Sequence, residues 1–279
     1  MRLPNLSSLM YVAHLRYIQS IHEPPDLRNP DSRVGHFIPV FKRLQMAWWL
    51  SAKELSRLRA DPFYYYLVAR TRYYDEVIKT AVSSHGVQHI VSVGCGTDTR
   101  PYRFESLLRD RHVKFLECDQ PYAIKVKQRM VKRWRRLYPV DYLPIDLNDD
   151  AWPEMESALR DRSGSKVLVL MEGVSPYVND TNVTRFLRLL ATKLAPGSRV
   201  AYDFKLRGIK DDFGRAERVP TPFRLPSERR EIAAFHEALG FKLELAELSS
   251  ALSERLLPSL AGSTDTRFRE DGLVQLTVA

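Results

Sequence analysis

The stretch from His89 to Phe104 reads HIVSVGCGTDTRPYRF, and it decides the fold. An apolar run ends in two glycines, Gly94 and Gly96, with one residue between them, and Pro101 opens a predicted helix. In α/β proteins, a buried strand that ends in glycines and feeds a helix lets a nucleotide approach the backbone. A plain tight turn can carry the same glycines, so the rest of the chain must decide between the two interpretations.

The residues after these glycines argue against two common nucleotide ligands. A dinucleotide fingerprint needs a third glycine for helix packing, and Thr99 stands at that position. A phosphate-binding P-loop ends in Gly-Lys-Ser or Gly-Lys-Thr, and this stretch contains neither triplet. A nucleoside ligand without a pyrophosphate remains, and S-adenosylmethionine fits this description.

From residue 89 onward, predicted strands alternate with predicted helices. Helices are expected from Asp119 to Leu137, from Asp180 to Leu194 and from Pro226 to Gly240. This alternation predicts an α/β fold with a mostly parallel, seven-stranded sheet, helices on both faces and right-handed crossovers. The seven strands are expected near residues 90–93, 113–118, 142–145, 167–171, 199–204, 241–246 and 273–278.

The first part of the chain is predicted to be helical, which divides the protein into an N-terminal helical cap (1–85) and a Rossmann-like domain (86–279). One helix is expected over residues 37–60, where Trp48 and Trp49 lie. Another is expected from Pro62 to about Val82, with Asp61 as its N-cap. The aromatic residues of this part would cover a pocket or simply pack in a core.

Arg70 lies in the middle of the apolar stripe of this second helix, whereas Arg72 lies on the opposite side near Asp75 and Glu76. A guanidinium on a core-facing stripe needs an anion or a hydrogen-bonding network. Arg70 is therefore expected either in an internal salt bridge or as a clamp on the carboxylate of a bound amino-acid moiety. Arg72 is expected in a surface ion pair.

The second, third and fourth predicted strands each end in an acidic residue. Asp119 follows the second strand, Asp146 and Leu147 the third, and Glu172 the fourth. Because ligands of open parallel sheets bind at the carboxyl ends of the strands, these residues are expected in one site. A carboxylate at Asp119 can accept both ribose hydroxyls, Asp146-Leu147 can hold adenine, and Glu172 can favour a cationic sulfonium.

Composition sets further limits. The 279 residues carry a formal net charge of +9, part of it in the basic segment 125–136, which suggests an acidic partner or a solvated helix. Two cysteines, Cys95 and Cys118, read as small buried thiols and not as a disulfide scaffold. The sequence shows no membrane span and no secretory signal, so a cytoplasmic protein without a membrane partner is expected. No metal ligands are assigned.

Five segments in order resemble the leucine carboxyl methyltransferase family, a branch of the class I S-adenosylmethionine-dependent methyltransferases. They are DPFYYYLVARTRYYD, GCGTDTRPYRF, FLECDQP, PIDLNDDAW and LMEGVSPYV, and together they cover about residues 60–205. The resemblance implies that the cofactor is held by Arg70, Gly94, Gly96, Asp119, Asp146, Leu147 and Glu172. Cys95 replaces the usual alanine, and the N-terminal region looks more like bacterial members that act on small or carrier-bound natural products.

The resemblance implies an O-methyltransferase that forms a methyl ester on a small, carrier-bound or peptide acid. Proximity and alignment would supply the catalysis, because a carboxylate is already ionised at pH 7. No catalytic base stands out, since four histidines, His85, His89, His112 and His236, read as loop or surface residues. Tyr177 and Arg100 are candidate acceptor-side residues, with packing and ion pairs to Glu105 or Asp110 as the alternatives.

Three other functions stay open at this level. The basic segment allows an RNA-binding or tRNA-modifying relative, and a catalytically inactive S-adenosylmethionine-binding module would carry the same cofactor residues. A nicotinamide-dependent dehydrogenase is a further enzyme class, although Thr99 in the third-glycine position counts against it. The oligomeric state cannot be read from the sequence.

Overall fold

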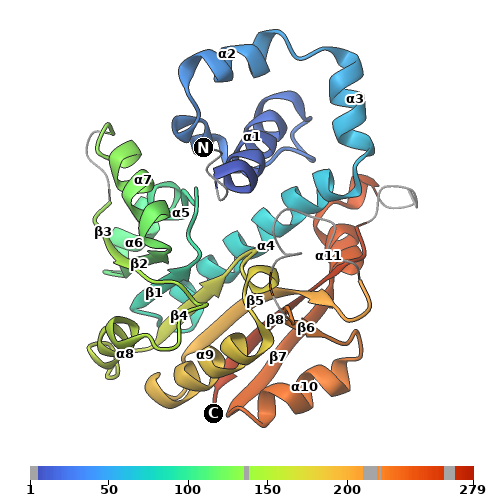
Figure 1. Cartoon of the computed structure of the whole chain (residues 1–279). Coiled ribbons are helices and arrows are strands. Elements are labelled where there is room, and N and C mark those ends of the chain that lie inside the picture. Colours follow the sequence, from blue (N-terminus) through green and yellow to red (C-terminus); the bar gives the residue numbers. More distant parts are fainter. Residues whose placement is uncertain (1–5, 135–137, 210–218, 220, 261–267) are drawn as a thin grey trace. The chain divides into compact units, whose positions relative to one another are not determined.

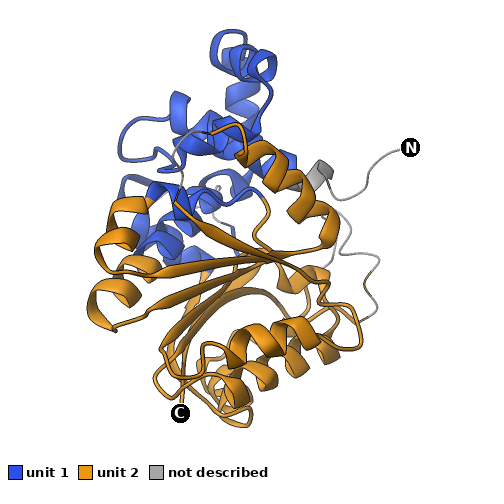
Figure 2. Ribbon diagram, turned by 90° about the vertical axis from the view of Figure 1, so that its left-hand side faces the viewer, with its two compact units in different colours: residues 1–76, 97–103, 249–269 blue, residues 77–96, 104–248, 270–279 orange. Residues whose placement is uncertain are grey.

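The computed structural model describes residues 6–134, 138–209, 219, 221–260 and 268–279. Two compact units interleave along the chain, as Figure 2 shows. Unit 1 contains residues 1–76, 97–103 and 249–269, and unit 2 contains residues 77–96, 104–248 and 270–279. The boundary expected at residue 85 stays a prediction.

Unit 2 is built on one eight-stranded sheet, which Figure 1 shows. The order along the sheet is β3-β2-β1-β4-β5-β8-β7, with β6 paired to β5. The first five strands of this order are parallel, and β8 runs antiparallel to both β5 and β7. The bounds are β1 His89–Val93, β2 Lys114–Asp119, β3 Val140–Pro144, β4 Val167–Met171, β5 Arg199–Leu206, β6 Arg224–Leu225, β7 Phe241–Leu248 and β8 Asp271–Val278.

The Rossmann-like, mostly parallel sheet is confirmed, and all seven predicted strands are present. The eighth strand, β6, was not expected. It contains only Arg224 and Leu225, at the end of a polar stretch. Two residues are too few to show the alternating pattern from which strands are predicted.

Helices cover both faces of the sheet in unit 2. Met155 of α8, Phe186 of α9 and Ile232 of α10 share one core cluster with Val169 of β4. On the other face, Lys127 of α7 contacts a side chain of β2, and the end of α4 packs near β4 and β5. The bounds are α6 Glu105–Asp110, α7 Pro121–Val131, α8 Pro153–Arg160, α9 Asp180–Lys193 and α10 Arg229–Glu237, with the short turn η2 at Ser175–Tyr177.

The described residues of unit 1 form helices and the loops that connect them. Helix α4 starts in it, and the residues of α4 after Glu76 belong to unit 2. As expected, α4 begins at Pro62, where the Asp61 carboxylate accepts the Phe63 N–H at 2.9 Å. The bounds are α1 Leu6–His22, η1 Ser32–Phe37, α2 Val40–Trp48, α3 Ala52–Ala60, α4 Pro62–Ser84, α5 Arg100–Arg103, α11 Ser249–Leu256 and η4 Pro258–Leu260.

The single helix expected over residues 37–60 is wrong, because the segment forms two helices. The Ser51 hydroxyl accepts the Glu54 N–H at 3.2 Å, and the Glu54 carboxylate accepts the Ser51 N–H at 2.9 Å. This reciprocal capping box starts α3 at Ala52, whereas α2 has already ended at Trp48. The Ser-x-x-Glu spacing was visible in the sequence and could have located the break.

Two other helix bounds also differ from the expectation. Helix α7 ends at Val131 and does not continue toward Leu137, which lies outside the described residues. Helix α10 starts at Arg229, three residues after Pro226, because Glu228 takes the extended N-cap conformation. Within the described ranges, no helix is both long enough and apolar enough to cross a bilayer.

A buried polar pair lies in the core of unit 2. The Tyr202 hydroxyl of β5 lies 2.6 Å from Nε2 of His236 in α10, and Nδ1 of His236 lies 2.6 Å from the Ile232 carbonyl oxygen. A carbonyl only accepts, so Nδ1 carries the proton and Nε2 accepts from the tyrosine. Burial lowers the pKa of His236 to about 4. The surface position expected for His236 is therefore wrong, since the ring is fully buried and neutral.

This neutral histidine predicts a specific pH dependence of stability. Unfolded His236 binds a proton below pH ~6.5, whereas the folded protein resists protonation down to a pH of about 4. The free energy of unfolding should therefore fall by up to about 3 kcal/mol as the pH drops through this window. Urea unfolding at a series of pH values should show this slope in the wild type and a weaker slope in His236→Gln. Identical slopes in both proteins would contradict the assignment.

Candidate functional site

The glycine loop after β1 is held tightly against the loop after β4. Gly94 has a φ of +68°, and a Cβ atom on it would lie 2.2 Å from Cγ2 of Val174. Any side chain at residue 94 would be strained and would collide with Val174. Cys95 and Cys118 are buried thiols without a disulfide, as expected, and burial raises the pKa of both.

The Asp119 carboxylate at the end of β2 is fixed by the backbone on both of its oxygens. Oδ2 accepts the Gly96 N–H at 2.8 Å, and Oδ1 accepts the Gln120 N–H at 2.8 Å. Burial raises the pKa of Asp119, although these two hydrogen bonds and the Lys127 ammonium act in the opposite direction. A carboxylate oxygen has two lone pairs, so each oxygen retains one for a further donor.

A chain of hydrogen bonds continues from Asp119 along the edge of the sheet. The Gln120 side chain donates to Oδ2 of Asp146 at 2.6 Å, and Oδ1 of Asp146 accepts the Asn148 N–H at 2.9 Å. The Asn148 amide then donates to the Tyr177 carbonyl oxygen at 3.0 Å. The ends of β1, β2 and β3 and the turn η2 are thus joined by one polar path in unit 2.

Leu147 and Glu172 extend this arrangement on either side. Leu147 is buried, and its carbonyl oxygen accepts the Asn182 amide of α9 at 2.9 Å. Val93 pairs with Met171 in the parallel register of β1 and β4, so Gly94 and Glu172 leave neighbouring strands at the same level. The structure therefore brings together the predicted site residues of unit 2, namely Gly94, Gly96, Asp119, Asp146, Leu147, Glu172 and Tyr177.

Asp203 supports the loop after β4 and was not noticed in the sequence. Its carboxylate accepts the Gly173 N–H at 2.7 Å, and its carbonyl oxygen accepts the Ser175 hydroxyl at 2.6 Å. Asp203 is itself buried in β5. An acid inside a predicted buried strand was the available signal, because such a residue needs hydrogen-bond donors around it.

Arg70 belongs to unit 1 and is buried, with 6% of its surface exposed. Its guanidinium carbon lies 5.6 Å from the ring centre of Phe63 and 5.7 Å from that of Tyr66. Tyr66 stacks in turn on Phe268 at 4.6 Å. The expected inward orientation of Arg70 is confirmed by this burial, and its role toward a cofactor stays a prediction.

Arg100 and Arg103 take part in a buried ion-pair cluster of unit 1. Nε of Arg100 donates to Asp75 at 2.9 Å, and Nη1 of Arg100 lies 3.3 Å from Asp98. Arg103 binds both oxygens of Asp75 at 2.7 Å. The ion pair considered for Arg100 with Glu105 or Asp110 is thus wrong in its partner, because Arg100 binds Asp75 and Asp98.

The position of Arg100 also bears on its candidate role at the acceptor. Arg100 is only 1% exposed, so contact with an acceptor, which stays a prediction, would require the buried cluster to open. Arg72, expected to pair with Asp75 and Glu76, instead donates to the carbonyl oxygens of Leu256, Asp26 and Arg28.

A buried ion pair beneath the glycine loop was missed in the sequence. The Lys127 ammonium of α7 lies 2.6 Å from Oε1 of Glu117 in β2 and 3.4 Å from the Cys95 carbonyl oxygen. Both side chains are at most 2% exposed. Lys127 falls on the apolar face of the basic segment, and a charge at such a position was the signal that it points inward.

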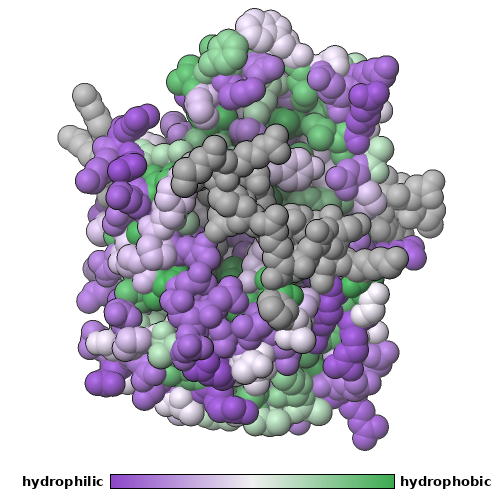
Figure 3. All heavy atoms as spheres, in the orientation of Figure 1, coloured by the Kyte–Doolittle hydropathy of each residue, from purple (hydrophilic) through white to green (hydrophobic). Residues whose placement is uncertain are grey.

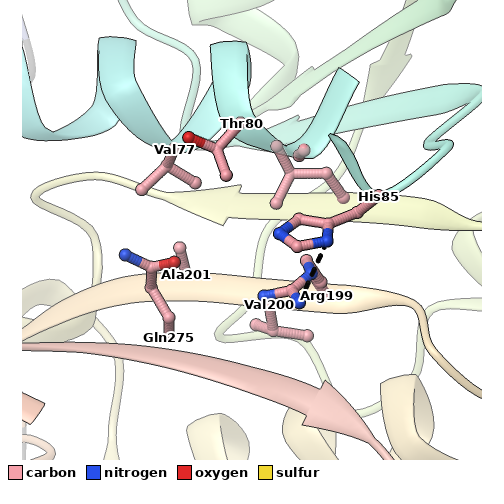
Figure 4. Close-up of a pocket in the computed structure, with 9 residues that line it drawn as sticks. Val77, Thr80, His85, Arg199, Val200, Ala201 and Gln275 are labelled. Carbon is pink, nitrogen blue, oxygen red and sulfur yellow. Dashed lines mark hydrogen bonds between the residues drawn. The ribbon is translucent and has the colours of Figure 1, made fainter. Parts of the chain in front are cut away.

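A small pocket in unit 2 lies away from these residues. It lies between the end of α4 and the sheet and has a volume of about 10 Å³, which holds about one water molecule. Figure 4 shows the His85 ring facing the guanidinium of Arg199, at 3.4 Å, near the beginning of β5. Burial first, and the neighbouring charges of Arg199 and Lys166 next, lower the pKa of His85. The pocket is too small for a nucleoside.

The ion pair beneath the glycine loop gives a prediction about stability. Lys127→Met leaves the Glu117 carboxylate buried without its ammonium partner and should lower the free energy of unfolding by about 3–5 kcal/mol. Adding Glu117→Leu should restore most of this loss, because an apolar pair needs no compensation. Lys125→Met, at an exposed position of the same helix, is the matched control. If the single and double variants unfold at the same urea concentration, the two charges are not coupled.

Comparison with known proteins agrees with this geometry. The family described as leucine carboxyl methyltransferase matches residues 32–191. A Mycobacteroides abscessus protein named "Putative S-adenosyl-L-methionine-dependent methyltransferase" is 29% identical over 219 residues, which cover 74% of this chain and 66% of that protein. A similarly named Streptomyces coelicolor protein is 25% identical over 204 residues, covering 72% and 70% of the two chains.

A solved structure supports the fold. A duf574 family protein from Streptomyces avermitilis has a TM-score of 0.59 at 15% identity, and the match covers 96% of this chain and 97% of that one. The family match spans more than half of the chain and includes the glycine loop and the ends of β2, β3 and β4. The chain therefore belongs to the leucine carboxyl methyltransferase family of S-adenosylmethionine-dependent methyltransferases.

Proposed function

We propose that this protein transfers the methyl group of S-adenosylmethionine to a carboxylate of a small, carrier-bound or peptide substrate, forming a methyl ester. The observation that carries the proposal is the backbone-anchored carboxylate of Asp119 at the start of the polar path to Asp146. Each acid stands where the family pattern has a cofactor-binding residue.

The residues present fit the cofactor part by part. Asp119 can accept two ribose hydroxyls, because each of its oxygens uses only one lone pair on the backbone. The Asp146 carboxylate can accept the exocyclic amine of adenine, beside the buried Leu147. Glu172 would place negative charge near the sulfonium, and Arg70 would hold the methionine carboxylate.

Methyl transfer to a carboxylate requires mainly that the protein aligns the cofactor with the acceptor. The cofactor supplies an activated methyl group, and the chain would bind, orient and shield the two reactants. A carboxylate acceptor is already ionised at neutral pH and needs no base. Among the described residues, His236 is locked as a neutral hydrogen-bond partner of Tyr202, and His85 faces Arg199 in the small pocket. Neither histidine belongs to the polar path from Asp119 to Tyr177, which agrees with an acceptor that needs no base.

The type of bond that the transferred methyl group forms in the product tests the proposal most directly. Incubation with methyl-labelled S-adenosylmethionine and a bacterial lysate should put label into a product that releases methanol under mild base. Asp119→Asn should lose most of this label, because an amide offers one acceptor oxygen in place of two. Base-stable label in a small molecule would show an ether or N-methyl product. Base-stable label in the RNA fraction would support the RNA-modifying alternative.

The role of Arg70 can be tested through cofactor affinity alone. Arg70→Ala should weaken binding of S-adenosylmethionine at least about tenfold, because a charge-assisted hydrogen bond to a carboxylate is lost. Isothermal titration calorimetry measures the effect, with Lys79→Ala, at an exposed position of the same helix, as the control. Arg70 also packs on Phe63 and Tyr66, so both variants need an unfolding curve. Unchanged affinity in a folded Arg70→Ala protein would remove Arg70 from the site.

A further inference from the structure

Helix α2 of unit 1 carries a concentrated group of exposed apolar side chains. Each of the following side chains is about half or more exposed: Val40 60%, Phe41 65%, Leu44 49%, Trp48 79% and Trp49 67%. Helix α2 contains no buried residue. In Figure 3, green and pale side chains lie among purple ones in the region of this helix. Single exposed apolar residues are ordinary, but five within ten positions form a patch that needs a reason.

The helix is amphipathic, but its apolar face is the outer one. With about 100° per residue, Val40, Phe41, Leu44 and Trp48 fall within about 100° of one another around the axis. The half-buried side chains of α2 are instead Arg43, Met46 and Ala47. The Met46 carbonyl oxygen lies 2.7 Å from Nε2 of His22 in α1, so this inner face is tied to the rest of unit 1.

Basic residues outnumber acidic ones in α2 and in the segment that follows it. Residues 38–60 contain five basic residues and one acidic residue. The acid is Glu54, and its carboxylate is already bound to Ser51 in the capping box of α3. The five basic residues are Lys42, Arg43, Lys53, Arg57 and Arg59. The Arg59 charge is balanced by Glu23 at 2.9 Å. Lys42, Lys53 and Arg57 are exposed.

We propose that α2 docks on the surface of an anionic lipid membrane, with Phe41, Leu44 and Trp48 inserted among the headgroups. A helix with Trp, Phe and Leu on one face and Lys and Arg beside it is suited to lie in the plane of such an interface. Tryptophan rings favour this depth because they are apolar with one polar N–H group. The exposed lysines would meet the negative lipid charge.

The charge pattern argues against a second copy of the chain as the occupant. Helix α2 carries Lys42 and Arg43 and no acidic residue, so two copies facing each other through α2 would bring like charges to the interface without a counter-charge from this helix. An anionic bilayer offers apolar chains to the apolar face of α2 and negative headgroups to the basic residues at the same time. The absence of a bilayer-crossing helix among the described residues is no obstacle, because a docking helix lies on the membrane and does not span it.

Vesicle co-sedimentation tests the proposal. Vesicles of phosphatidylcholine with phosphatidylglycerol should bind the protein, and vesicles of phosphatidylcholine alone should bind it weakly. Phe41→Ser combined with Trp48→Ser should reduce binding at least about tenfold. Lys42→Gln combined with Lys53→Gln should reduce binding to anionic vesicles by roughly fivefold per charge. Trp fluorescence should shift to the blue with anionic vesicles and lose most of the shift in the Phe41/Trp48 variant.

Tyr122→Ser is the matched control, because Tyr122 is a large apolar side chain with 46% exposure on α7 of unit 2. This change should leave vesicle binding intact. The α2 changes affect exposed side chains, so all variants should keep the wild-type unfolding midpoint. Failure of the folded wild type to bind either kind of vesicle overturns the proposal. Concentration-dependent dimerisation that the Phe41/Trp48 variant abolishes, without vesicle binding, overturns it in favour of a second copy.

Discussion

The contact between Gly94 and Val174 is the constraint on which the site depends. It brings the end of β1 against the loop after β4 so closely that a methyl group cannot fit between them. The backbone that follows turns toward β2, where the Gly96 N–H reaches the Asp119 carboxylate. Close packing at one residue therefore sets the spacing of three neighbouring strand ends, on which the proposed cofactor site is built.

Charges beneath the loop reinforce this spacing. The Lys127 ammonium joins the Glu117 carboxylate to the Cys95 carbonyl oxygen, so α7, β2 and the glycine loop are connected through one buried group. Asp203 does the same for the loop after β4. In each case a buried ionisable side chain, Lys127 or Asp203, holds a loop that has no regular secondary structure of its own.

Much of the fold and of the candidate site could be predicted from the sequence, and the features that could not be predicted have physical causes. The strands and the acids at their ends follow from alternation and from the rule that parallel strands end at one edge. Contacts between residues that are far apart in the sequence could not be predicted, because the spacing of residues along the chain does not show which side chains meet in the folded protein. His236 reads as a surface residue until Tyr202 is seen opposite it, and Arg100 gives no sign that Asp75 is its partner. The break between α2 and α3 was available in the Ser51–Glu54 spacing, whereas β6 was too short to show any pattern.

The position of Asp75 in the sequence, before the glycine loop, limits how the chain can be shortened. Asp75 lies on α4, and the two arginines that it binds lie beyond β1, although all three belong to unit 1. A chain shortened by its first 76 residues would keep Arg100, Arg103 and Asp98 and would lose Asp75, the carboxylate that binds both arginines. A fragment that begins at the glycine-rich strand would therefore keep two buried arginines without the carboxylate that they share, which is costly for a buried ion pair.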